Sequence, residues 1–182
     1  MPRARCTDCR CLPTAPGCSW RAKPGISTPH RSRPYHERMA HPIRIREIDH
    51  VVLRVRDLER SLHFYTQVLG CQEERRIEQL GLVQLRAGAS LIDLVPVDLP
   101  LGRAGGAPPG KEGRNVDHIA FRLVDLDPDA VRAHLASHGV EASEIGIRYG
   151  AEGHGPSLYL NDPDDNVIEL RGEPLPEEQR GD

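Results

Sequence analysis

The chain has 182 residues, of which 38% are hydrophobic and 28% charged, a composition typical of a globular protein with room for one substantial core. Its net charge of −3 combines a basic first forty residues, with eight Lys or Arg and two acids, and an acidic remainder. An acidic body argues against nucleic acid or an anionic membrane as a partner, and no apolar run approaches the ~20 residues that span a bilayer.

Residues 1–40 hold six of the 16 prolines and four of the five cysteines, without any apolar periodicity. This composition predicts a disordered N-terminal extension, with Met39 as the expected natural start and zinc binding by the cysteines as a minor alternative. Cys71 is the only cysteine in the remainder, so no disulfide can form there. A single thiol fits a reducing compartment and predicts a cytoplasmic protein.

Residues 46–96 predict a strand, a helix and three further strands. Residues 46–55 alternate between apolar and polar side chains, as a strand does. Asp57 can cap a helix whose apolar residues recur at helical spacing, and Gly70 can end it. Strands are expected at 72–78, 81–87 and 89–96, with a turn at Gly88.

A second series of the same kind follows the Gly- and Pro-rich linker at 97–115. It begins with a strand at 116–124 and a helix that runs from Asp127-Pro128 to Gly139. Strands are expected near 141–145, 156–161 and 166–171. Residues 173–182 are expected to form a flexible tail.

The two series are copies of one unit. IDHVVLRVRDL (residues 48–58) matches VDHIAFRLVDL (residues 116–126), and LIDL (91–94) matches VIEL (167–170). Each copy therefore begins with a strand that carries a histidine and ends with a strand that carries a carboxylate. This duplication predicts an α+β fold of two tandem βαβββ units, at 46–96 and 116–172.

Four ionisable residues lie within these apolar strands: His50, Asp93, His118 and Glu169. Burying such groups is costly unless they are paired, and together they could bind a divalent cation. Nitrogen and oxygen ligands without thiolate suit Ni, Co, Zn, Mn or Fe. Any one of them alone is more often a satisfied core or surface residue, but their repetition in both halves favours a metal site.

Two motifs resemble the glyoxalase/bleomycin-resistance/dioxygenase (vicinal oxygen chelate) superfamily. NDPDDNVIEL (residues 161–170) resembles its Asp-Pro-Asp-Gly-Asn-x-Ile-Glu-Leu ending, and residues 57–70 resemble its first helix. The resemblance covers about residues 46–172. It implies a curved mixed sheet around a metal cavity, formed by the two βαβββ units.

Within that superfamily the chain looks most like glyoxalase I. The resemblance implies one divalent ion held by His50, Asp93, His118 and Glu169. Arg54 matches a position that holds the glutathione carboxylate. Arg122 is a further expected anion clamp, and Tyr159 is expected to line the cavity. Two residues depart from the pattern: Asp93 replaces the usual Glu or Gln, and Val97 replaces Asn, which puts the use of glutathione in doubt.

The implied activity is that of a lactoylglutathione lyase-like lyase or isomerase. It would act on a small-molecule substrate through a metal-chelated enediolate. Glu169 would be the general base, and Asp93 could share that role. The family implies a homodimer. An alternative is an iron-dependent extradiol dioxygenase that uses His50, His118 and Glu169. A thiol transferase acting on fosfomycin-like epoxides and a metal-free drug-binding resistance protein are further alternatives.

Overall fold

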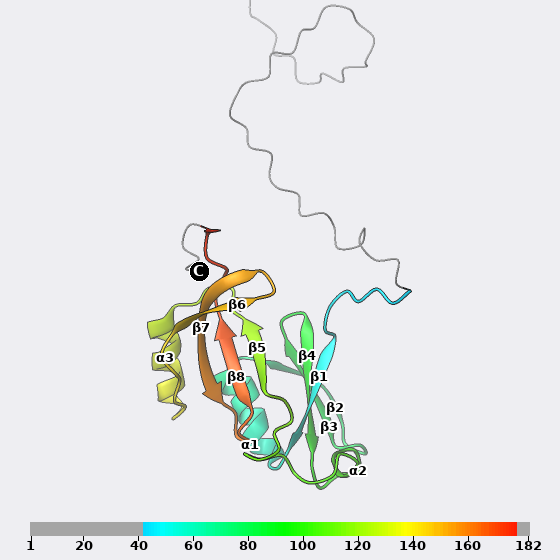
Figure 1. Cartoon of the computed structure of the whole chain (residues 1–182). Helices are drawn as coiled ribbons and strands as arrows, with labels where there is room; N and C mark the ends of the chain where they lie inside the picture. Colours follow the sequence, from blue (N-terminus) through cyan, green and yellow to red (C-terminus); the bar gives the residue numbers. More distant parts are fainter. Residues whose placement is uncertain (1–41, 178–182) are drawn as a thin grey trace, which may run out of the picture. The chain divides into compact units, whose positions relative to one another are not determined.

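The computed structural model describes residues 42–177, and its main compact unit begins at Glu47 (Figure 1). The predicted extension at residues 1–40 lies outside the described residues, as does the end of the predicted tail from residue 178. Within the described part, no helix has the length and apolar character needed to cross a bilayer.

The first module is a four-stranded sheet with one long helical segment. Its strands are β1 (His50–Val55), β2 (Gln72–Ile77), β3 (Leu82–Ala87) and β4 (Ser90–Pro96), in the order β1-β4-β3-β2. β1 and β4 are parallel, and the other neighbours are antiparallel. The predicted helix is present as α1 (Leu58–His63), continued by the wider π-helical η2 (Phe64–Val68). Asp57 caps α1 by accepting a hydrogen bond from the Arg60 backbone N–H.

The second module repeats this arrangement. Its strands are β5 (His118–Arg122), β6 (Gly146–Gly150), β7 (Gly153–Asn161) and β8 (Val167–Arg171), in the order β5-β8-β7-β6. The pair of β5 and β8 is parallel, as β1 and β4 are. Helix α3 (Pro128–Ser137) begins after Asp127, whose side chain accepts hydrogen bonds from two backbone N–H groups. The predicted α+β fold of two tandem units is confirmed.

The structure differs from the sequence-based prediction around the β6–β7 hairpin. β6 occupies Gly146–Gly150 rather than 141–145, where only Ala142 forms an isolated bridge with Leu160. β7 begins at Gly153, three residues before the strand expected near 156–161. Gly150 allows the backbone of β6 to pack directly against Arg171, because a Cβ atom on this residue would lie 2.5–2.7 Å from the Arg171 guanidinium. The linker also contains a short helix, α2 (Pro100–Arg103), that the sequence analysis did not predict.

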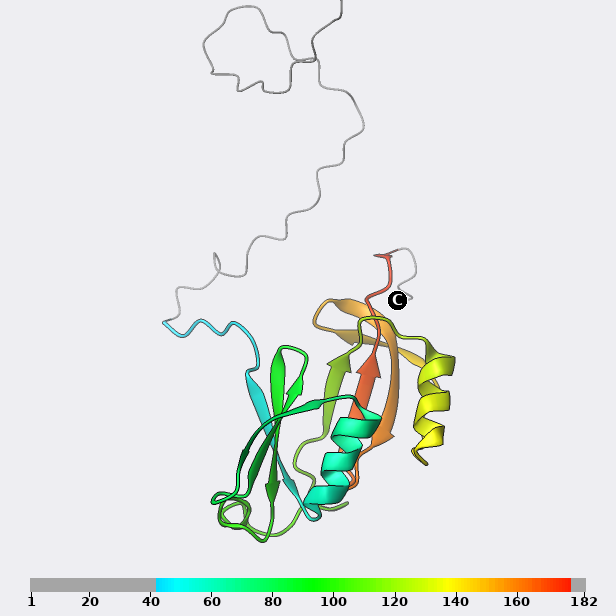
Figure 2. The ribbon, with the colours of Figure 1, turned by 180° about the vertical axis from the view of Figure 1, so that it is seen from behind.

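One hydrophobic core joins the two modules around α1, which lies at the centre of Figure 2. In the edge strand β1, alternation sends one set of side chains into this core and leaves the other set on an open face, whereas its neighbour β4 is buried on both faces along most of its length. In β1, Leu53 and Val55 are 0% exposed, whereas Val52 is 49% exposed. The core draws on both sheets and on the helices, with buried residues that include Leu62, Tyr65, Leu85, Leu94, Leu135, Leu158, Ile168 and Leu170.

A buried polar network also links the modules. The turn between β7 and β8 contains Asp162 and Asp164, both almost fully buried. The Tyr65 hydroxyl donates to Asp162 Oδ2 at 2.9 Å, and the Ser61 hydroxyl donates to Asp164 Oδ2 at 3.3 Å. The Arg56 backbone N–H donates to Asp164 Oδ1 at 3.1 Å. The terminal motif of the second module thus binds the beginning of the first module's helix.

Candidate metal centre

His50 and Asp93 lie on the open face of the first sheet. In the parallel pairing of β1 and β4, His50 is opposite Leu91 and Val52 is opposite Asp93, so the two residues share a face and are diagonal neighbours. The His50 side chain is 48% exposed, whereas Asp93 is only 4% exposed. The Gln84 side-chain amide donates to both Asp93 carboxylate oxygens, at 3.2 and 3.1 Å.

His118 and Glu169 occupy the equivalent places on the second sheet. His118 is opposite Val167 and Ala120 is opposite Glu169, which is the same register as in the first sheet. His118 Nε2 lies 3.4 Å from Glu169 Oε2. The Ser157 hydroxyl and the Arg171 guanidinium donate to the other oxygen, Glu169 Oε1, at 2.6 and 3.1 Å. The sequence duplication is therefore also a duplication of geometry.

Each histidine is oriented by the aspartate that precedes it. His50 Nδ1 lies 2.8 Å from Asp49 Oδ1, and His118 Nδ1 lies 2.7 Å from Asp117 Oδ2. The carboxylate accepts a hydrogen bond from the Nδ1–H group of the neutral ring, which leaves the Nε2 lone pair free for a metal ion. The hydrogen bond to Asp49, followed by the charge of Asp93, raises the pKa of His50 above its ordinary value of 6.5. Asp49 and Asp117 were not among the site residues predicted from the sequence, although the repeated Asp-His pair signals this role.

The structure brings the four predicted ligands together as two pairs. Among residues 42–177, no group of three or more His, Cys, Asp or Glu side chains is arranged to hold an ion. Each pair offers one imidazole nitrogen and one carboxylate, a donor chemistry that suits a divalent transition metal. Each pair alone supplies two ligands, so the two pairs fit such an ion only as the two halves of one site. Their use as ligands stays a prediction, and it requires the halves to meet.

The three predicted substrate-binding residues have different surroundings. The Arg54 guanidinium donates to the carbonyls of Gly102, Gly105 and Gly106 in the linker, at 3.0, 2.8 and 2.6 Å. Arg122 shares the open face with His118, and its Nη1 donates to the Gly172 carbonyl at 3.3 Å. The Tyr159 ring lies edge-on to the His118 ring, with centroids 6.2 Å apart. Tyr159 thus borders the second half-site, whereas Arg122 lies near the carboxylates of Glu152 and Glu173, at 3.6 and 3.9 Å, and Arg54 holds the linker.

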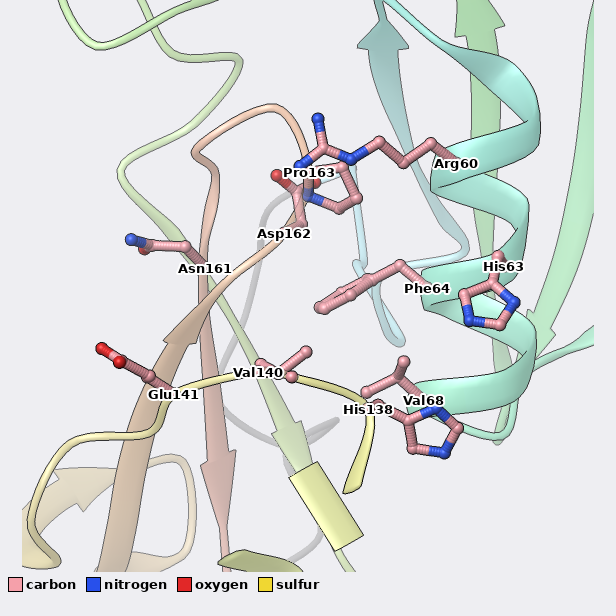
Figure 3. Close-up of a pocket in the computed structure, with 11 residues that line it drawn as sticks. Arg60, His63, Phe64, Val68, His138, Val140, Glu141, Asn161, Asp162 and Pro163 are labelled. Carbon is pink, nitrogen blue, oxygen red and sulfur yellow. The ribbon is translucent and has the colours of Figure 1, made fainter. Parts of the chain in front are cut away.

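A groove of about 330 Å³ lies elsewhere, between the α1–η2 helical segment, the loop that follows α3 and the end of β7 (Figure 3). Phe64 projects into it from the helix, and Asp162 and Pro163 border it on the other side. None of the four candidate ligands lines this groove. The groove is therefore separate from the candidate metal centre.

Comparisons with known proteins agree with this fold. Residues 47–170 match the model of the Glyoxalase/Bleomycin resistance protein/Dioxygenase superfamily. The chain is 28% identical over 146 residues to the glyoxalase domain-containing protein RDO1 of Mycosarcoma maydis, covering 75% of this chain and 74% of that protein. It is 31% identical over 124 residues to the catechol-2,3-dioxygenase of Bacillus subtilis, covering 68% of this chain but only 40% of that enzyme.

Solved structures share the architecture as well. The crystal structure of a virulence protein of Salmonella typhimurium superimposes with a TM-score of 0.58 at 26% identity, over 71% of this chain and 98% of that one. An integron cassette protein of Vibrio cholerae gives a TM-score of 0.56 at 27% identity, over 71% and 97% of the two chains.

Proposed function

Because the chain belongs to the Glyoxalase/Bleomycin resistance protein/Dioxygenase superfamily, we propose that it is a divalent-metal-dependent lyase or isomerase, similar to lactoylglutathione lyase. Its substrate is a small molecule with two neighbouring oxygens. The observation that carries this proposal is the His–carboxylate pair that recurs at the same register in both sheets. A structural ion pair has no need to recur in this way, whereas a four-ligand site built by duplication does.

The complete site forms between two copies of the chain. Each copy exposes two half-sites on its open faces, and neither half offers more than two of the ligands. In a two-fold symmetric dimer, His50 and Asp93 of one copy face His118 and Glu169 of the other, and the reverse pairing forms a second site. The exposed Val52, between His50 and Arg54, supplies apolar surface that such an interface covers.

The residues of the chain have distinct roles in this chemistry. A bound divalent ion supplies Lewis-acid polarisation of the substrate oxygens, which acidifies the neighbouring C–H bond. By analogy with the family, Glu169 would give up its place on the ion and use the freed Oε2 to remove the proton from one carbon and return it to the neighbouring carbon, and Asp93 can share this role. Tyr159 borders the substrate on the second half-site, and Arg122, on the same face of β5 as His118, attracts substrate anions in competition with Glu152 and Glu173. The N–H groups of Arg54 that the linker carbonyls leave free can bind an anionic substrate group at the first half-site.

Turnover of the hemithioacetal of methylglyoxal and glutathione tests the proposal, with protein reconstituted separately with Ni²⁺, Co²⁺, Zn²⁺ and Mn²⁺. Loss of the general base in Glu169→Gln should lower kcat by about 10²- to 10⁴-fold. Glu144→Gln is the control, because the Glu144 side chain is 91% exposed and pairs with Arg132. If no reconstituted form turns over this or related α-hydroxy carbonyl substrates and Glu169→Gln behaves as wild type, the proposal is wrong.

A second candidate is an iron-dependent extradiol dioxygenase, which the 31% identity to a catechol-2,3-dioxygenase favours. Such an enzyme needs two histidines and one carboxylate and leaves Asp93 without an ion to bind. Anaerobic loading with Fe²⁺, followed by catechol and oxygen, should then give a ring-cleavage product in both wild type and Asp93→Asn. In the lyase or isomerase, Asp93→Asn instead weakens metal binding.

A further inference from the structure

The two oxygens of the Glu169 carboxylate have different surroundings. Oε1 accepts hydrogen bonds from Ser157 Oγ at 2.6 Å and from Arg171 Nη1 at 3.1 Å. Oε2 lies beside His118 Nε2, at 3.4 Å. Ser157 is 0% exposed and Arg171 is 6% exposed, so water does not compete strongly for either donor. One oxygen is thus occupied by the protein, and the other remains beside the histidine.

Arg171 is itself fixed in place beneath the β6–β7 hairpin. Its Nη2 donates to the carbonyls of Arg148 and Gly153, both at 3.1 Å. Gly150 lets the hairpin pass close to the guanidinium, since a Cβ atom there would overlap it. Among the described residues, Arg171 Nε is the one buried side-chain nitrogen or oxygen without a hydrogen-bond partner. Burying an arginine with one unpaired N–H group is energetically unfavourable. A function that requires a fixed positive charge beside Glu169 would explain it.

Asp93, the matching carboxylate of the first half-site, is held differently. Its only side-chain hydrogen-bond donor among the described residues is the neutral amide of Gln84, which contacts both oxygens at nearly equal distances. The ion pairs within 4 Å among the described residues do not include Asp93, although its charge raises the pKa of the neighbouring His50, and Gln84 singles out neither oxygen. The two half-sites share a register and differ in how tightly the carboxylate is oriented.

We propose that Ser157 and Arg171 are positioning residues of the metal centre, which hold Glu169 Oε1 so that Oε2 alone faces the ion. This inference rests on the proposed function. A carboxylate anchored through one oxygen presents the other at a fixed place and angle, so the ion finds its ligand already oriented. Gln84 orients Asp93 more loosely, so its loss affects the ion less.

A pair of buried serines provides a matched test in the full-length protein. Ser157 and Ser61 are both 0% exposed and each donates to a buried carboxylate, but only Ser157 donates to a candidate ligand. The readouts are Mn²⁺ affinity, from the EPR signal of the free ion, and the melting temperature of the metal-free protein. Mn²⁺ is chosen because it prefers oxygen and nitrogen ligands to the cysteines near the N-terminus.

Ser157→Ala should weaken Mn²⁺ binding by about 10- to 100-fold, whereas Ser61→Ala should lower the melting temperature and keep wild-type affinity. Arg171→Lys, which keeps the charge but loses the planar fork, should also weaken binding, and Gln84→Leu should do so less than either. The inference is overturned if Ser157→Ala and Arg171→Lys bind Mn²⁺ as wild type does. It is also overturned if Ser61→Ala weakens binding equally. A wild-type protein that binds no divalent ion overturns the proposed function as well.

Discussion

Asp164 is a carboxylic acid that the fold buries beside a second acid, Asp162. It is 2% exposed, and burial raises its pKa above the ordinary value of 3.8, although hydrogen bonds from Arg56 and Ser61 oppose the rise. The folded state therefore holds this proton more tightly than the unfolded state does. It follows that Asp164 contributes most to stability below its ordinary pKa and that this contribution is lost as the pH rises through the raised pKa.

The Asp164→Asn variant should remove this part of the pH dependence. The amide oxygen can still accept from the Arg56 backbone N–H, and the amide nitrogen can donate to Ser61, so the local structure is retained. Urea unfolding measured from about pH 4 to about pH 7 should show a smaller decline in the free energy of unfolding than in wild type. Asp125→Asn, at an exposed position, should follow the wild-type profile. An unchanged slope in Asp164→Asn would contradict this prediction.

At the scale of single residues, the sequence determines which side chains of a strand share a face. Because side chains alternate along a strand, His50 shares a face with Arg54, and His118 with Arg122, and the strand registers agree. It did not predict what surrounds them. Arg54 contacts carbonyls that lie 48–52 residues away in the sequence, and the donors that hold Glu169 lie on β7 and β8. Such contacts depend on how elements pack, which periodicity does not encode.

Tyr65 connects two elements, the helical segment of the first module and the terminal turn of the second. Its side chain is 0% exposed, and burial together with the Asp162 carboxylate raises its pKa well above 10, so the hydroxyl stays neutral and donates. Tyr65→Phe removes this donor while keeping the ring, and should lower the free energy of unfolding by about 1–2 kcal/mol.

Chemical denaturation measures this effect, and Tyr149→Phe is the matched control. The Tyr149 side chain is 75% exposed, so its hydroxyl remains hydrated in either state and its removal should change stability by less than about 0.5 kcal/mol. Equal effects of the two substitutions would show that the bond between Tyr65 and Asp162 does not stabilise the junction of the modules.

At the scale of elements, capping residues and periodicity located the helices well. Asp57 and Asp127 accept the hydrogen bonds expected of N-caps, and the strands with clear alternation lie where predicted. The prediction failed at β6, a strand that begins with Gly146 and ends with Gly150. Gly150 makes room for the Arg171 side chain of β8, and a local pattern does not report such a neighbour.

The whole molecule offers a direct test of a site shared between copies. In such a dimer, a His50→Ala chain and a His118→Ala chain each damage both sites when alone. Mixed in equal amounts and allowed to exchange, they form heterodimers in which one site holds both substitutions and the other is intact. Metal content and activity should then recover to about a quarter of the wild-type level, from random pairing.

The matched control mixes two variants of the same half-site, His50→Ala and Asp93→Ala. Every site in that mixture carries one damaged half, so no recovery is expected. A site contained within one chain predicts no recovery from either mixture, because every chain then carries a broken site. Recovery in the first mixture alone therefore distinguishes the two arrangements.

At the scale of the whole molecule, the sequence duplication predicted two equivalent modules but not how the modules pack together. It placed one His–carboxylate pair in each module, but it did not predict that the two pairs would lie apart within one chain. Their separation follows from the shared core, in which α1 packs against residues of both sheets. This packing involves residues far apart in the sequence, and the repeat carries no information about it.

The hydrogen bonds between residues 56–65 and the β7–β8 turn have a consequence for how the protein folds during synthesis. Tyr65 and Asp162 are separated by 97 residues, and the Arg56–Asp164 contact by 108. During translation, the first helical segment leaves the ribosome long before Asp162 and Asp164, which accept its hydrogen bonds, have been synthesised. The N-terminal half of the nascent chain therefore stays incompletely buried until the last segment has been synthesised, and that segment completes the fold.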